Sequence, residues 1–69
     1  MVTIHLITLD SAESFGKITF VIENITMIYK DKWYDVRVCS SDGTSCIVKQ
    51  SPEEITQRIN MIMYNKTGE

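Results

Sequence analysis

The side chains best suited to binding chemistry in this sequence are aromatic and cationic, and they lie close together. Trp, Tyr and Arg are the usual anchors of protein interfaces. Aromatic rings beside cations can also stack on a nucleobase and pair with its phosphate. Simple packing of Trp33 and Tyr34 beside a hairpin turn would explain these two rings equally well. The candidate binding residues are Tyr29, Lys30, Lys32, Trp33, Tyr34 and Arg37.

Catalytic chemistry has little support in the sequence. His5 is the only histidine, and a histidine general base needs a nucleophile and an orienting acid beside it. Cys39 or Cys46 could supply the nucleophile and Asp35 the acid, but only if the order of the strands brought them to His5. We therefore predict no catalytic residues and a protein that is not an enzyme.

Metal and cofactor sites are not expected either. The spacing of Cys39 and Cys46 matches no zinc motif, and a structural zinc site needs four ligands. The acidic residues do not have the spacing of a calcium-binding loop. The three glycines stand apart from one another, so they do not form a phosphate-binding loop. We predict no cofactor.

The length of 69 residues allows one small domain. A chain of this size buries roughly 60% of its unfolded surface and often needs a staple or a partner subunit for stability. Hydrophobic residues at 43% and charged residues at 23% are typical of a folded protein. We predict one β-rich domain over residues 1–64 that ends in a helix, followed by a flexible tail over residues 65–69.

The charge pattern argues against two classes of partner. The net charge is −2, and the seven Lys and Arg residues are scattered along the chain. Generic nucleic-acid binding requires clustered cations, and an anionic membrane surface attracts the same kind of cluster. The sequence also has no apolar stretch of the roughly 20 residues that span a membrane and no signal-peptide pattern. We predict a cytoplasmic protein that binds neither nucleic acid generically nor a membrane.

Alternating apolar residues predict about five strands, separated by turn-forming residues. The clearest alternation is in the fourth segment, where Tyr34, Val36 and Val38 are expected on one face. Turns are expected over residues 10–16 and at Asp31-Lys32. The first four predicted strands are Val2–Leu9, Lys17–Ile22, Ile25–Lys30 and Trp33–Cys39, and the fifth follows Asp42-Gly43.

The pair Asp42-Gly43 is a strong hairpin signal, and it allows two registers. A two-residue loop would place Val38 opposite Ile47. A three-residue loop would place Val38 opposite Cys46 and keep one face of the hairpin apolar. We therefore predict the three-residue loop, with Gly43 in a left-handed bulge position.

This register also bears on the two cysteines. It places Val36 opposite Val48 and Cys39 opposite Ser45 rather than opposite Cys46. A disulfide between the cysteines is therefore not expected, which agrees with a reducing compartment.

The segment Ser51-Pro52-Glu53-Glu54 predicts the start of a helix. Ser51 suits the N-cap, proline suits the first helical position, and glutamate at the third position can return the cap. The two glutamates also suit the positive end of the helix dipole, which accounts for them without catalysis. The helix is expected to continue to about Tyr64. Its apolar stripe consists of Ile55, Ile59, Ile62 and Met63.

The predicted fold class is α+β: a small antiparallel β-meander of about five strands with one C-terminal α-helix packed on the sheet. One helix covers one face of a sheet, so the other face lacks cover unless the sheet curves strongly. That surplus of apolar surface favours a homo-oligomer. The candidate oligomer contacts are Ile28, Met61 and Tyr64. The uncovered face is expected to carry some of Ile7, Leu9, Ile28, Trp33 and Ile47.

Residues 18–62 carry a pattern of strand, hairpin turn, strand and helix start. The matching segments are Ile18–Ile28, Val36–Val38 and Asp42–Ile55. In this pattern the chain resembles the FlbD-like family of small flagellar and swarming-motility proteins, in which Gln50 would be Glu and Asp31–Tyr34 would have no firm counterpart. The resemblance implies a motility-associated role and brings no catalytic residues. The small architecture also resembles that of phage proteins, which implies an inhibitor or a ligand trap.

Together these features predict a non-enzymatic binding module. In the first hypothesis, a homo-oligomer docks on a larger protein partner through its aromatic surface and modulates or inhibits that partner. In the alternative, a phage-encoded protein sequesters a small anionic signalling molecule, such as a nucleotide, at a subunit interface. The alternative depends on the cations that lie beside Tyr29, Trp33 and Tyr34 in the sequence.

Overall fold

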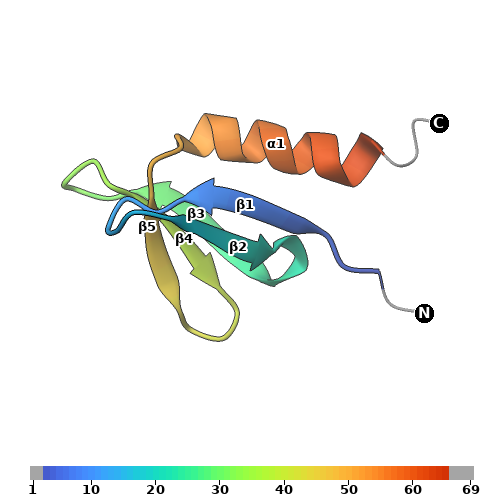
Figure 1. Cartoon of the computed structure of the whole chain (residues 1–69), viewed down its shortest axis with the longest axis horizontal. Coiled ribbons are helices and arrows are strands. Elements are labelled where there is room, and N and C mark those ends of the chain that lie inside the picture. The colour runs from blue at the N-terminus through green and yellow to red at the C-terminus, as the bar shows by residue number, and fades with distance from the viewer. Residues whose placement is uncertain (1–2, 66–69) are drawn as a thin grey trace.

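The computed structural model describes residues 3–65, and it confirms the predicted α+β fold class (Figure 1). Residue 65, the first of the predicted tail, ends the helix. Residues 66–69 of that tail and Val2 of the first predicted strand lie outside the described residues. The elements are β1 (Leu6–Asp10), β2 (Lys17–Val21), the short 3-10 helix η1 (Ile22–Asn24), β3 (Ile25–Lys30), β4 (Val36–Ser40), β5 (Ser45–Val48) and α1 (Pro52–Asn65).

The strands form two sheets that meet at one corner. β1 pairs with β2, and β3, β4 and β5 form the second sheet, with every pairing antiparallel. The end of β1 reaches β5 through a bridge between Ser11 and Val48. Beside this bridge, Lys49 N donates to Asp10 O at 2.9 Å, and Ala12 N donates to Ile47 O at 2.9 Å. This corner is a backbone connection between the two sheets.

One apolar core lies between the two sheets and α1. Ile7 and Leu9 are only 2% and 1% exposed, so the expectation that they lie on an uncovered sheet face is wrong. The second sheet and α1 cover that side of β1, because the chain divides its strands between two sheets instead of forming one open sheet. The buried apolar residues are Ile7, Leu9, Phe20, Ile22, Val36, Val38, Val48 and Ile55.

The predicted register of the β4–β5 hairpin is confirmed. Val38 pairs with Cys46, and Cys39 pairs with Ser45. Gly43 has a φ of 94°, a left-handed conformation that favours glycine, and its N–H donates to Ser40 O at 3.0 Å. Both cysteines are free thiols, as expected.

Helix α1 begins as predicted, because Glu54 N donates to the Ser51 hydroxyl oxygen at 3.1 Å. The apolar stripe faces the core: Ile55 is fully buried, and Ile59, Ile62 and Met63 pack around it. The helix lies against β1 and β3. In the part of the chain that the structure describes, no helix is both long and apolar enough to cross a membrane.

The fourth strand is shorter than predicted. We expected it to begin at Trp33, but β4 begins at Val36. Residues 31–35 form a loop instead, because Asp31 binds the backbone N–H groups of Trp33, Tyr34 and Asp35. These N–H groups are therefore not available for a strand ladder.

Candidate functional site

The connection between β3 and β4, here called the aromatic loop (residues 31–35), is organised by one aspartate. The Asp31 carboxylate oxygen Oδ1 accepts from Trp33 N at 2.9 Å and from Asp35 N at 3.0 Å. The backbone of Asp31 donates to Asp35 O and accepts from Tyr34 N, both at 2.9 Å. Asx-type bonds of this kind fix a turn without help from neighbouring elements.

Arg37 holds the same aspartate from the adjoining strand. Its Nε donates to Asp31 Oδ2 at 2.8 Å, and the Asp31 side chain is only 9% exposed. Partial desolvation opposes ionisation of Asp31, but hydrogen bonds from Arg37, Asp35 and Trp33 outweigh it, so the pKa of Asp31 lies below its ordinary value. The hydrogen bond to Asp31 raises the pKa of Arg37. The pair is therefore charged at neutral pH and fixes the base of the loop.

The two aromatic side chains of the loop project into solvent. Trp33 is 66% exposed and Tyr34 is 81% exposed. Tyr34 has a φ of 65°, a left-handed conformation that is uncommon for an aromatic residue. Lys32 Nζ lies 4.6 Å from the centroid of the Trp33 ring, in the position of a cation–π contact. The loop thus presents two large rings and one cation together.

The structure places the six candidate binding residues on three surfaces. Lys32, Trp33 and Tyr34 are on the aromatic loop. Tyr29 pairs with Arg37 across β3 and β4, so these two side chains share one face of the sheet. Lys30 is the neighbour of Tyr29 in the strand and therefore points to the opposite face. The structure thus brings Lys32, Trp33 and Tyr34 together, places Tyr29 beside Arg37, and separates Lys30 from Arg37.

The cations of this site are largely engaged by groups of the protein itself. Arg37 is bound to Asp31, and Lys32 lies over the ring of Trp33. An anionic ligand would have to compete with the Asp31 carboxylate for Arg37 and displace Lys32 from the ring face. This arrangement suits contact with a protein surface better than capture of a phosphate.

The three candidate oligomer contacts differ in exposure. Ile28 packs against the core and lines a groove of about 280 Å³ beside Ile59 of α1. Met61 and Tyr64 are exposed, as expected for residues off the apolar stripe of the helix. Of the residues predicted on an open face, Ile47 is half-buried.

Phe15 is an exposed aromatic residue that the sequence analysis did not single out. It is fully exposed in the β1–β2 loop, residues 11–16. The buried Ser11 orders this loop: its hydroxyl accepts from Glu13 N at 3.2 Å, and its N–H donates to Gly16 O at 3.0 Å. In Figure 1 this loop and the aromatic loop both lie at the end of the molecule away from the termini. The sequence did contain a signal for this exposed residue, because Phe15 is a large aromatic residue among turn-forming residues.

The hypothetical Cys–His–Asp arrangement is not assembled. His5 has a different carboxylate partner: its Nδ1 contacts Glu23 Oε2, and its backbone N–H donates to Glu23 Oε1 at 3.0 Å. These hydrogen bonds from His5 lower the pKa of Glu23 to about 2. Asp35 and Cys39 lie near opposite ends of β4. Among the described residues, no group of three potential metal ligands occurs.

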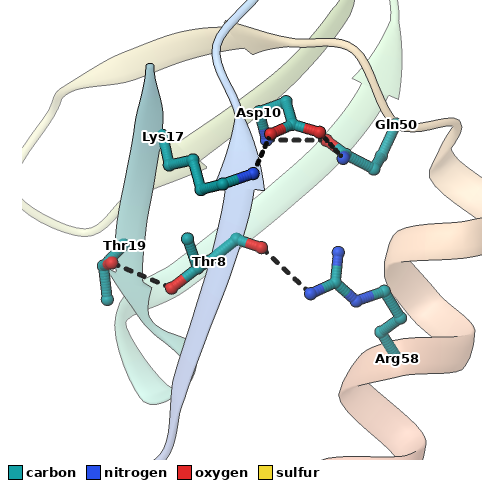
Figure 2. A network of polar contacts seen from close by, with 6 residues as sticks. All are labelled: Thr8, Asp10, Lys17, Thr19, Gln50 and Arg58. Atoms are coloured by element: carbon teal, nitrogen blue, oxygen red, sulfur yellow. Dashed lines mark hydrogen bonds and ion pairs between the residues drawn. The ribbon is translucent and has the colours of Figure 1, made fainter.

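A second polar network joins β1, β2 and α1, and we call it the clasp (Figure 2). Asp10 accepts from Lys17 Nζ at 2.6 Å and from Gln50 Nε2 at 2.9 Å, and its N–H donates to Gln50 Oε1 at 3.0 Å. The hydrogen bonds that the Asp10 carboxylate accepts from Lys17 and from Gln50, the one from Lys17 first, lower its pKa. Arg58 of α1 donates to Thr8 O at 3.0 Å, and the Thr8 and Thr19 hydroxyls share a hydrogen bond of 2.9 Å.

The aromatic loop and the clasp offer different surfaces to a partner. The polar groups of the clasp bind one another and connect β1, β2 and α1. The rings of the aromatic loop face solvent. Comparison of this chain with protein-family models, with curated proteins and with solved structures finds no match.

Proposed function

We propose that this chain is a non-enzymatic protein-binding module that docks on a larger protein through the aromatic loop and modulates or inhibits it. One observation carries the proposal: Trp33 and Tyr34 stand 66% and 81% exposed on a loop that Asp31 holds in place. Aromatic side chains contribute the largest contact areas at interfaces. Because the loop is ordered before docking, binding sacrifices less conformational entropy.

The backbone of Tyr34 supports this proposal. A non-glycine residue in the left-handed region costs about 1–3 kcal/mol, and such residues cluster at binding sites. The φ of 65° is retained because Tyr34 N donates to Asp31 O at 2.9 Å. The chain therefore accepts strain in order to present the ring of Tyr34 to solvent.

Sequestration of a small anionic molecule remains the alternative, and it is less well supported. The guanidinium of Arg37 is bound to Asp31, and Lys32 covers a face of the Trp33 ring. Lys30 lies on the other face of the sheet from Arg37. A cytoplasmic location, a phage or motility-associated origin and self-association remain predictions.

The proposal is tested by single and double alanine variants of Trp33 and Tyr34. Tagged protein is used to capture partners from a lysate of its own cells, and the captured protein is then purified for titration calorimetry. We expect W33A and Y34A each to weaken binding by roughly 30-fold or more, because interface hot spots are worth about 2–4 kcal/mol. Circular dichroism checks that the variants fold.

Phe15→Ala is the matched control, because it removes a still more exposed aromatic side chain from the other loop. We expect F15A to bind the purified partner as the wild type does. Equal binding by W33A, Y34A and the wild type would disprove the proposed docking site. A loss of binding in F15A alone would move the docking site to the β1–β2 loop.

A further inference from the structure

Strand β2 has one unpaired edge. Ile22 N donates to His5 O at 2.8 Å, and strand hydrogen bonds alternate along an antiparallel pair. The backbone groups of Ile18 and Phe20 therefore point toward β1, and those of Lys17, Thr19 and Val21 point away from it. β2 has no neighbour on that second side. Within the described residues, no hydrogen bond reaches these three backbone N–H or C=O groups.

The hydrogen bonds on the opposite edge of β1 agree with this alternation of backbone directions. Asp10 O accepts from Lys49 N, and Thr8 O accepts from the Arg58 side chain, so both carbonyls point away from β2. α1 and β5 thus occupy the second edge of β1. The edge of β2 has no comparable cover, and exposed edges of this kind are templates for pairing with another strand.

A groove of about 240 Å³ runs along this edge. Its lining combines side chains of β2, among them Ile18 and Phe20, with side chains of the β4–β5 hairpin. The lining residues are Ile18, Thr19, Phe20, Val21, Asn24, Ser40, Asp42, Thr44 and Cys46. Hydrogen bonds from the Thr44 N–H and hydroxyl lower the pKa of Asp42, so the hairpin side of the groove carries a negative charge at neutral pH.

We propose that this edge pairs with β2 of a second copy of the chain, with Thr19 opposite Thr19 across a two-fold axis. The pairing is antiparallel, so it joins the two β1–β2 sheets into one four-stranded sheet. In this register every outward N–H and C=O of β2 finds a partner. On the inner face, Ile18 of one copy lies opposite Phe20 of the other, a favourable pairing of a β-branched and an aromatic side chain.

The charges at the two ends of β2 complement each other in this dimer. Lys17 is at one end, where it pairs with Asp10 of its own copy at 2.6 Å and keeps a side chain that is 69% exposed. Asp42 lies near the other end, because its neighbour Ser41 donates to Asn24 O at 2.7 Å. Antiparallel pairing brings Lys17 of each copy to the end of the groove where the other copy has Asp42. A two-fold axis forms this contact twice. The inference is independent of the proposed docking site, because the β2 edge and the aromatic loop share no residue.

The first test is Thr19→Pro, measured by analytical ultracentrifugation over a concentration series. Proline removes the outward N–H and is tolerated on a strand edge. We expect T19P to remain folded by circular dichroism and to raise the dimer Kd by at least about tenfold. Thr19→Val is the matched control, because it also removes the hydroxyl bond to Thr8 but retains the N–H. We expect T19V to dimerise as the wild type does.

The second test traps the register directly. In a background with Ser at positions 39 and 46, Thr19→Cys should form a covalent dimer on oxidation, because residues opposite each other in a strand pair are within disulfide reach. Lys17→Cys should not, since Lys17 lies opposite Val21. Asp42→Asn keeps the acceptor for Thr44 and removes the charge, and we expect it to raise the dimer Kd roughly two- to fivefold.

Several outcomes would overturn the inference. One is a wild-type chain that sediments as a monomer throughout while T19C fails to cross-link. Another is a dimer that T19P leaves unchanged. A dimer lost on Met61→Ser but retained in T19P would assign the interface to α1 instead. The two proposals can be tested separately. Partner binding that persists in T19P would show that docking does not require the β2 edge, and dimerisation that persists in W33A would show that the dimer does not require the aromatic loop.

Discussion

Two aspartates organise two regions of this molecule with the same chemistry and different results. Asp31 holds the aromatic loop, and its side-chain partners lie no more than six residues along the chain. Asp10 holds the clasp, where it accepts from Lys17 and exchanges two hydrogen bonds with Gln50, 40 residues away. The local network shapes a surface, whereas the distant one joins separate elements.

Sequence separation explains this difference. Hydrogen bonds between near neighbours restrict few residues, so they can order a loop at low entropic cost and leave its tip exposed. The bonds between Asp10 and Gln50 form only after β1 and the start of α1 have come together. The clasp should therefore affect the free energy of unfolding, and the aromatic loop should affect binding.

The largest effect that separates the two regions is expected from Gln50→Ala. This change removes two hydrogen bonds to Asp10 and leaves the Asp10 N–H without its partner, so we expect the free energy of unfolding to fall by roughly 2 kcal/mol. Binding through the aromatic loop should not change. Urea unfolding measures the first quantity and calorimetry the second.

Gln57→Ala is the control for Gln50→Ala, because Gln57 is exposed on the polar side of α1. A change of this kind should alter the free energy of unfolding by no more than about 0.5 kcal/mol. If Q50A and Q57A were equally stable, the clasp would not stabilise the fold.

A smaller effect is expected from Asp31→Asn. The remaining oxygen of Asn can still accept from Trp33 N and Asp35 N, but its NH₂ group would face the Nε–H of Arg37, and two donors cannot bond. We expect the partner Kd to rise roughly tenfold, because a loosened loop must be ordered on binding. Asp35→Asn is the matched control, since it removes a nearby charge and leaves the hydrogen bonds of the Asp31 side chain in place. Equal losses in D31N and D35N would show that charge, not order, governs binding.

The smallest effect is expected from acid. Asp10 and Asp31 have pKa values below their ordinary value of 3.8 in the folded state. A carboxylate with a lowered folded-state pKa stabilises the fold above its unfolded pKa, and this contribution is lost as the pH falls through the folded value. Both regions should therefore be unaffected down to about pH 4. Below that pH, fluorescence of Trp33, the single tryptophan, reports the loop, and circular dichroism reports the fold.

If acid changed the fluorescence of Trp33 and left the circular dichroism unchanged, Asp31 alone would be titrating. Loss of both signals below about pH 4 is the expected outcome, because protonation of Asp10 weakens its bonds to Lys17 and Gln50 as protonation of Asp31 weakens its bond to Arg37. A transition well above pH 4 would contradict the lowered pKa values of both aspartates.

The local elements of this fold could be predicted from the sequence, because their causes are local. The apolar alternation of β4 and β5 set the register, and Ser51-Pro52 marked the first turn of α1. The corner between the sheets could not be predicted in this way. It depends on backbone bonds from Asp10 and Ala12 to residues far along the chain, and no side-chain pattern signals them.

The candidate site was predicted in part for a similar reason. The cluster of aromatic and cationic residue types indicated the segment in which the structure exposes Trp33 and Tyr34. The alternation of Tyr34, Val36 and Val38 suggested that the strand extends through Trp33, but the Asp31 side chain binds the backbone there instead. Sequence patterns show which residue types could bind a partner. They do not show that the Arg37 guanidinium is already paired with the Asp31 carboxylate, because this pairing depends on the folded geometry of the loop.

The corner between the two sheets also has a consequence for the order in which the chain folds. The β1–β2 and β4–β5 hairpins close short loops, which takes microseconds. The bridge between Ser11 and Val48 closes a much longer loop, so we expect it to form after the hairpins and to cost more loop-closure entropy than any one of them. We therefore expect the slow step in the folding of this small domain to be the formation of the corner, at which the two sheets come together around their common core.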